Sequence, residues 1–150
     1  MGSWTVYLSG EIHSDWRERI HAGVEAAGLA VELVSPVTNH YTSDNAGVEI
    51  LGAEQNSVWH DRKGAGLNAI RTRTLIERAD VVVVRFGDKY RQWNAAFDAG
   101  YATAIGTPVV TMHGPDTAHA LKEVDAAALA VAETPEQVVK ILAYVVEGTL

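Results

Sequence analysis

The sequence predicts a doubly wound α/β fold, with a central sheet of about five parallel strands. Short apolar, β-branched runs recur along the chain, and this composition is typical of strands buried on both faces. The clearest run is Val81–Val84. Segments with apolar residues at helical spacing separate most of these runs. The strands are therefore connected through helices, as parallel pairing requires.

Length and composition limit the class of protein. We expect a single domain over residues 1–150, because 150 residues with 47% apolar content can build one sizeable core. The net charge of −7 gives no electrostatic support for a nucleic acid polymer as partner. No apolar run approaches the ~20 residues of a membrane span, and the N-terminus lacks a signal-peptide pattern. We therefore expect a cytoplasmic protein without a membrane partner.

The first part of the chain predicts a strand–helix–strand unit. A strand over Thr5–Leu8 ends at Ser9-Gly10. The following helix has Ser14 or Asp15 as N-cap, and Asp15 with Glu18 has the spacing of a capping box. The helix closes at Gly28, and residues 29–34 form the second strand.

The middle of the chain predicts a long connection and a helix. Residues 37–47 are polar and indicate a loop that is long for this fold class. Residues 48–57 favour a short helix, and residues 60–66 are charged and contain glycine. Residues 67–78 predict a better helix, because their apolar positions recur at helical spacing.

The remainder predicts alternating strands and helices. The strand at 81–84 leads through the loop at 85–94 to a helix rich in small residues, which Gly106 and Pro108 end. Further elements are predicted as a strand over 109–112, a helix over 117–124, a weak strand over 127–131 and a helix beginning at Thr134-Pro135. This order fits a flavodoxin-like three-layer sandwich.

Polar side chains concentrate where a ligand of such a fold binds, beyond the carboxyl ends of the strands. Asp98 is the most informative, because Ala95, Ala99 and Ala102 place it on the packed face of its helix. A carboxylate among alanines has little structural purpose and favours a functional role. The candidate ligand contacts are Ser9, Gly10, Glu11 and His13 after the first strand and Asp88, Gln92, Trp93 and Asn94 after the third.

Several common sites are not predicted. The turn after the first strand contains one glycine, so it lacks the dinucleotide-binding fingerprint, and a P-loop is also missing. The histidines are scattered without metal-ligand spacing, and there is no cysteine. We therefore expect neither a metal nor a cofactor.

Two stretches resemble the nucleoside 2-deoxyribosyltransferases: VYLSGEI is similar to their first strand and turn, and FDAGYATAIGTPVV to the helix that carries their nucleophilic carboxylate. The segments GEIHSDW, SDNAGVEILG and FGDKYRQWNAAFDAGYA resemble the YtoQ-type branch of that superfamily. The resemblance covers nearly the whole chain.

The resemblance implies exchange at the N-glycosidic bond of a nucleoside or nucleotide, through a covalent glycosyl-enzyme. Asp98 then matches the nucleophile, and Tyr7 matches a tyrosine that hydrogen-bonds it. Asp88, Gln92 and Asn94 would contact sugar hydroxyls. Trp93 either walls a pocket for the base or covers the core. Members of the family are commonly oligomers, which implies a homodimer or larger assembly through the faces at 67–78 or 95–104.

Three positions depart from the family pattern. Asp98 stands where the family has a longer glutamate, Gln92 stands where it has an aspartate, and residues 68–74 contain no carboxylate to assist the leaving base. Two hypotheses from different classes therefore remain open. One is an enzyme that acts through Asp98, and the other is a non-catalytic module that binds or senses a nucleotide.

Overall fold

The computed structural model describes residues 2–150 and confirms the predicted fold class. A single sheet has the strand order β2-β1-β3-β4-β5, with every neighbouring pair parallel. The strands are β1 (Trp4–Gly10), β2 (Val31–Val34), β3 (Val81–Arg85), β4 (Val109–Met112) and β5 (Ala130–Ala132). The α-helices are α1 (Trp16–Ala26), α2 (His40–Leu51), α3 (Ser57–Arg78), α4 (Trp93–Ala104), α5 (Lys122–Ala127) and α6 (Pro135–Glu147), with a 3₁₀ turn at Pro115–Thr117.

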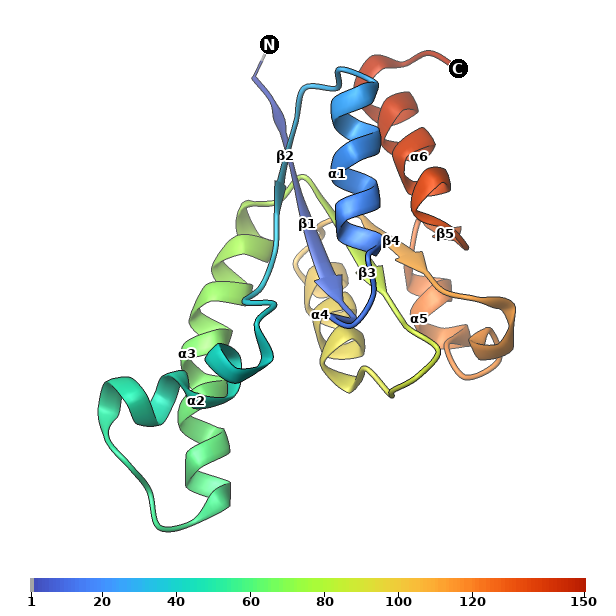
Figure 1. Ribbon diagram of the computed structural model, residues 1–150. Coiled ribbons are helices and arrows are strands. Elements are labelled where there is room, and N and C mark those ends of the chain that lie inside the picture. The colour runs from blue at the N-terminus through green and yellow to red at the C-terminus, as the bar shows by residue number, and fades with distance from the viewer. Residues whose placement is uncertain (1) are drawn as a thin grey trace.

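Helices cover both faces of the sheet (Figure 1). One face packs against α1 and α6, and the other packs against α3, α4 and α5. Successive side chains of a strand point to opposite faces. Along β1, Val6 and Leu8 therefore enter the first core, whereas Tyr7 enters the second. Ser9 follows Tyr7 by two positions and shares its face.

The strand order places the usual ligand-binding position of this fold class at the carboxyl ends of β1 and β3. The chain turns one way from β1 to β2 and the other way from β3 to β5, so the carboxyl ends of β1 and β3 flank the switch point of the sheet. Gly10 at the end of β1 pairs with Arg85 at the end of β3. The turns that follow these two strands thus begin side by side.

The segment between β2 and β3 differs most from the sequence prediction. Residues 40–47, predicted as loop, form the first part of α2, whereas the helix predicted at 48–57 ends at Leu51. The helix predicted at 67–78 begins earlier, at Ser57, as the 22-residue helix α3. Asn39 caps α2 by accepting a hydrogen bond from the backbone amide of Thr42. In Figure 1, α2 and the first half of α3 pack together and project beyond the sheet.

Smaller differences concern element ends. Asp15 precedes α1 but makes no side-chain capping bond, so the predicted capping box is wrong. The helix predicted at 117–124 is a 3₁₀ turn followed by α5, and the last strand is shifted to Ala130–Ala132. The predicted start of α6 is confirmed, since the hydroxyl of Thr134 accepts the backbone amide of Gln137. Within residues 2–150, no helix combines the length and apolarity needed to cross a membrane.

Candidate functional site

A hydrogen bond between Ser9 and Asp98 forms the centre of the candidate site. Ser9 is fully buried on β1, and Asp98 is partly buried in the second turn of α4. The Ser9 hydroxyl donates to Oδ2 of Asp98 at 2.6 Å. The buried alanines of α4, Ala95, Ala99 and Ala102, let the helix pack closely on the sheet and bring this carboxylate to the carboxyl end of β1.

Tyr7 lies on the same face of β1, but the expected hydrogen bond from Tyr7 to Asp98 is not formed. Tyr7 is fully buried, and its hydroxyl has no hydrogen-bond partner among the described residues. The residue that bonds the carboxylate is Ser9. A buried hydroxyl without a partner is costly, because it has lost its bonds to water. Tyr7 therefore has an unused donor in the core, on the face of β1 that also carries Ser9.

The surroundings of the two side chains change their acidities. Burial raises the pKa of Asp98, and the hydrogen bond from Ser9 partly opposes that rise. Burial, followed by the nearby carboxylate of Asp98, raises the pKa of Tyr7. The tyrosine therefore stays protonated at neutral pH and keeps its hydroxyl proton as a hydrogen-bond donor. A partly desolvated carboxylate is more reactive than a hydrated one and is a feature of functional sites.

Arg17, which the sequence analysis did not single out, fixes the end of β1. Its buried guanidinium donates to the carbonyl oxygens of Leu8 at 3.0 Å, Gly10 at 3.2 Å and Glu11 at 2.7 Å. Burial lowers the pKa of Arg17 to about 10, so it remains a cation at neutral pH. The one available signal was its position beside Trp16 and three residues before Ile20, on the buried side of α1.

Glu11 joins the turns after β1 and β3. Its buried carboxylate accepts the backbone amide of His13 and, at 2.6 Å, the hydroxyl of Ser14. These bonds tie the turn in place of the capping box. A Cβ on Gly87 would lie 2.5 Å from Cγ of Glu11, so only glycine fits opposite it. Gly10 is equally constrained, with a positive φ of 111° and space for no Cβ beside the carbonyl of Arg85. Glu11 and Gly10 thus shape the turn.

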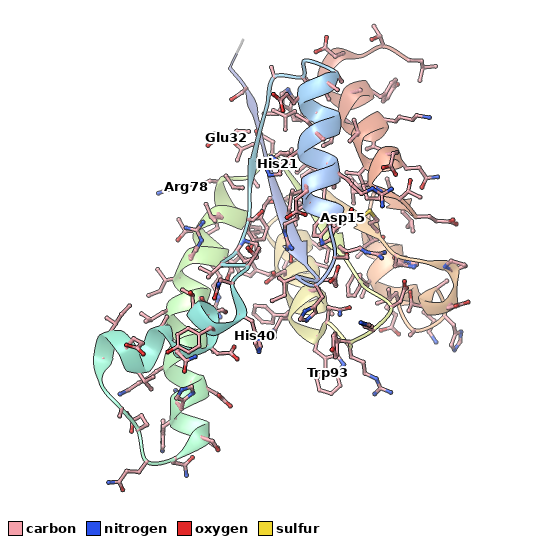
Figure 2. All side chains as sticks on the ribbon, viewed as in Figure 1. Asp15, His21, Glu32, His40, Arg78 and Trp93 are labelled. Carbon is pink, nitrogen blue, oxygen red and sulfur yellow. The ribbon has the colours of Figure 1, made fainter. Side chains whose placement is uncertain are left out.

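The other predicted contacts surround this centre at different depths. The side chain of Gln92 accepts the backbone amide of Gly87 at 2.8 Å, so it orders the loop after β3. The ring of His13 contacts that of Tyr90 at a centroid distance of 4.8 Å. Asp88 and Asn94 are exposed. Trp93 is 74% exposed at the first turn of α4 and points away from the sheet in Figure 2, so it does not cover the core.

Two surface hollows lie on the helices that cover the second face of the sheet. One of about 410 Å³ runs along α3, and its lining residues are Leu67, Ile70, Arg71, Thr74, Leu75 and Arg78. A second, of about 180 Å³, lies between α4 and α5 and is lined in part by Ala99, the neighbour of Asp98. Asp98 itself lines neither hollow. Residues 2–150 contain no group of three His, Asp or Glu side chains placed to hold a metal ion.

The strand order, the partly buried carboxylate on α4 and its hydroxyl partner on β1 define a flavodoxin-like α/β protein with an acidic centre at the switch point. A family profile described as nucleoside 2-deoxyribosyltransferase YtoQ matches residues 7–146. The chain therefore belongs to the YtoQ family of nucleoside 2-deoxyribosyltransferase-like proteins, as the resemblance predicted. It is 44% identical over 142 residues to the uncharacterized protein YtoQ of Bacillus subtilis (strain 168), with 95% of this chain and 96% of that protein covered.

Solved structures resemble the chain in fold. A 2-deoxyribosyltransferase from Bacillus psychrosaccharolyticus superposes with a TM-score of 0.53 at 15% identity, covering 89% of each chain. A conserved protein from Enterococcus faecalis V583 gives 0.58 at 14% identity, covering 94% of this chain and 98% of that one. The single-stranded-DNA-binding DNA processing protein A of Helicobacter pylori also gives 0.58 at 14%, covering 97% and 82%. At these identities the likeness extends to the fold alone.

Proposed function

We propose that the protein cleaves or transfers at the N-glycosidic bond of a nucleoside or nucleotide, with Asp98 as nucleophile. The observation that carries this proposal is the partly desolvated carboxylate of Asp98, held by one hydroxyl at the ligand-binding edge of the sheet. Membership of the family and the fold of a 2-deoxyribosyltransferase support the same reaction class.

The proposed reaction proceeds in two displacements. An oxygen of Asp98 attacks the anomeric carbon, the carbon–nitrogen bond breaks, and its electron pair leaves with the base. The resulting ester is then attacked by a second base, which gives transfer, or by water, which gives hydrolysis and returns the carboxylate. In this scheme the unpartnered hydroxyl of Tyr7 supports the site from below and turns to donate to Asp98 during the reaction. Asn94 lies one helical turn before Asp98 and reaches a sugar hydroxyl.

Substitution of Asp98 tests the proposal directly. Wild type, Asp98→Asn and the control Asp116→Asn are incubated with a panel of nucleosides and their 5′-monophosphates, and the released base is quantified by chromatography. Asp98→Asn keeps an acceptor for Ser9 but is a poor nucleophile. We expect its turnover to fall by roughly 10⁴–10⁶-fold, the scale on which loss of a covalent nucleophile acts. Asp116 is exposed, so Asp116→Asn should match wild type. Equal turnover of wild type and Asp98→Asn would remove Asp98 from the reaction.

We further propose that the active form is a homodimer, in which a second copy packs on α3 and α4 beside Asp98. Apolar side chains beside Asp98 are exposed in the single chain: Trp93 is 74% exposed, Phe97 57%, and Ile70 on the neighbouring α3 68%. Exposed aromatic residues gathered on adjoining helices mark association surfaces. Light scattering at micromolar concentration should give twice the chain mass, and Phe97→Ser should shift it toward the monomer. A wild-type monomer would contradict this assignment.

A binding module without catalysis is the second candidate. It is favoured by α3, whose residues 68–74 contain no carboxylate that could protonate a leaving base. There Asn68 donates to Ser43, and Arg71 donates to the carbonyl oxygen of Ser35. Thermal shift with the same panel separates the two functions. Stabilisation by a compound that is recovered intact favours binding, whereas recovery of free base favours the enzyme.

A further inference from the structure

We propose that Ser9 is the positioning residue of the site: its hydroxyl holds Oδ2 of Asp98 in place, so that Oδ1 is the oxygen left to attack the substrate. This inference rests on the proposed function, and it assigns the role that the family resemblance gave to Tyr7. The bond joins residues 89 positions apart, between β1 and α4, at 2.6 Å.

The backbone on both sides of Ser9 is fixed from the opposite face of the sheet. Arg17 binds the carbonyl oxygens of Leu8 and Gly10, which immediately flank Ser9. Gly10 pairs with Arg85 and packs closely against it, because a Cβ at Gly10 would lie 2.1 Å from the carbonyl oxygen of Arg85. With its neighbours held, the Cβ of Ser9 faces α4, and the bond to Asp98 selects the rotamer of its hydroxyl. The donor that orients Asp98 is therefore rigid.

The length of Asp98 makes such a donor necessary. Its carboxylate is one methylene shorter than that of a glutamate, so a holding group must come from a residue close to the backbone of α4. The Ser9 hydroxyl reaches Oδ2, whereas the Tyr7 hydroxyl on the same face has no partner. Attack requires reacting atoms within ~3–3.5 Å, and a carboxylate free to rotate would spend little time in that geometry.

Ser9 also sets how readily Asp98 is ionised. Donation from its hydroxyl favours the carboxylate and lowers the pKa of Asp98, against the opposite effect of burial. Removal of the hydroxyl should therefore raise the pKa of Asp98 further. A residue that only tied α4 to β1 would lower this pKa as well, so the rotamer of Asp98 is the readout that separates positioning from a structural tie.

The test uses NMR of the full chain and needs no substrate. The side-chain carboxyl carbon of Asp98, assigned with the aid of Asp98→Asn, is titrated in wild type, Ser9→Ala, Ser9→Thr and the control Ser14→Ala. Ser14 donates to Glu11 at 2.6 Å from the same turn, so Ser14→Ala removes an equally short bond that does not involve Asp98. We expect a higher pKa and averaged χ1 couplings for Asp98 in Ser9→Ala only, with Ser9→Thr restoring both.

A single Asp98 rotamer in Ser9→Ala would overturn the inference, whatever the titration or the activity of the protein. If Ser9→Ala does not fold, Ser9→Cys provides the same comparison, because a thiol is isosteric but a weak donor. With a turnover assay in hand, Ser9→Ala should lower kcat rather than raise KM and shift the acid limb of the rate profile to higher pH. The inference and the proposed function fail separately: a single Asp98 rotamer with Asp98-dependent turnover rejects the role of Ser9, whereas averaged couplings without any turnover reject the enzyme.

Discussion

The imidazole of His113 is bonded to the carboxylate of Asp125, with Nε2 and Oδ2 2.8 Å apart in the interior of the protein. His113 follows β4 directly, and its Nδ1 lies 2.7 Å from the carbonyl oxygen of Gly114. The other oxygen of Asp125 accepts the hydroxyl of Thr111 at 2.8 Å. This polar network fastens α5, a helix of six residues, to the sheet.

Loss of the His113 side chain should therefore destabilise the fold. His113→Ala leaves the partly buried carboxylate of Asp125 with Thr111 as its remaining partner, and loss of such a hydrogen bond costs about 1–3 kcal/mol. Urea unfolding followed by circular dichroism measures the difference. His119→Ala, an exposed histidine from the same region, should change the free energy of unfolding by less than about 0.5 kcal/mol. Similar values for the two variants would show that the network does not stabilise α5.

Two arginines on α1 should differ sharply when replaced. Arg17→Met leaves buried carbonyl oxygens without donors and should cost about 3–5 kcal/mol. Arg19 makes an exposed ion pair with Glu136 at 2.7 Å, so Arg19→Met should lower the free energy of unfolding far less than Arg17→Met. Both variants are compared by urea unfolding at the same ionic strength. Equal losses of unfolding free energy in Arg17→Met and Arg19→Met would show that Arg17 does not clamp the end of β1.

Asp98→Asn should be more stable than wild type at neutral pH. Burial raises the pKa of Asp98 in the folded protein, so ionisation of this group costs folding free energy once the pH rises above its ordinary value of 3.8. Below that pH the group is protonated in both the folded and the unfolded chain, and this cost is absent. The gain in melting temperature should therefore appear at pH 7 and vanish near pH 3. A loss of stability at pH 7 would show that the carboxylate is held favourably instead.

Glycine substitutions should separate close packing from helix propensity. Gly10→Ala introduces a Cβ 2.1 Å from the carbonyl oxygen of Arg85 at a φ of 111°, and we expect the melting temperature to fall by many degrees. Gly66 in α3 has open space around it, so Gly66→Ala should stabilise the protein by roughly 0.5–1 kcal/mol through helix propensity. Scanning calorimetry distinguishes the two. A tolerated Gly10→Ala would refute the close approach of β1 and β3.

The fold was predictable where local pattern and tertiary packing agree. The β-branched run of β3 and the alanine face of α4 were assigned correctly because their side chains are buried as their spacing implies. The first part of α2 was not predicted because the helix has no buried apolar stripe: Gly47 is its one buried residue, and Ile50 and Leu51 are exposed. Its order depends on contacts with α3, among them Asn68 to Ser43, which local sequence does not contain.

The sequence indicated the end of the sheet and the helix α4 on which the candidate site lies, but it did not indicate which residue bonds to Asp98. The small residues around Asp98 correctly indicated a carboxylate on the sheet side of α4. Tyr7 and Ser9 share one face of β1 because they are two residues apart, and spacing alone cannot decide which of them meets Asp98. Glu11 was assigned to a ligand, yet its carboxylate is taken by Ser14 and the amide of His13. Differences of a few tenths of an ångström between donor and acceptor atoms decide such pairings, and the sequence does not contain them.

The clamp formed by Arg17 has an evolutionary consequence. Every oxygen that it binds at the end of β1 belongs to the main chain, so the clamp imposes no chemical identity on the side chains of Leu8 or Glu11. Substitution of either side chain would leave these bonds in place, so the clamp itself tolerates sequence change on both sides of Ser9.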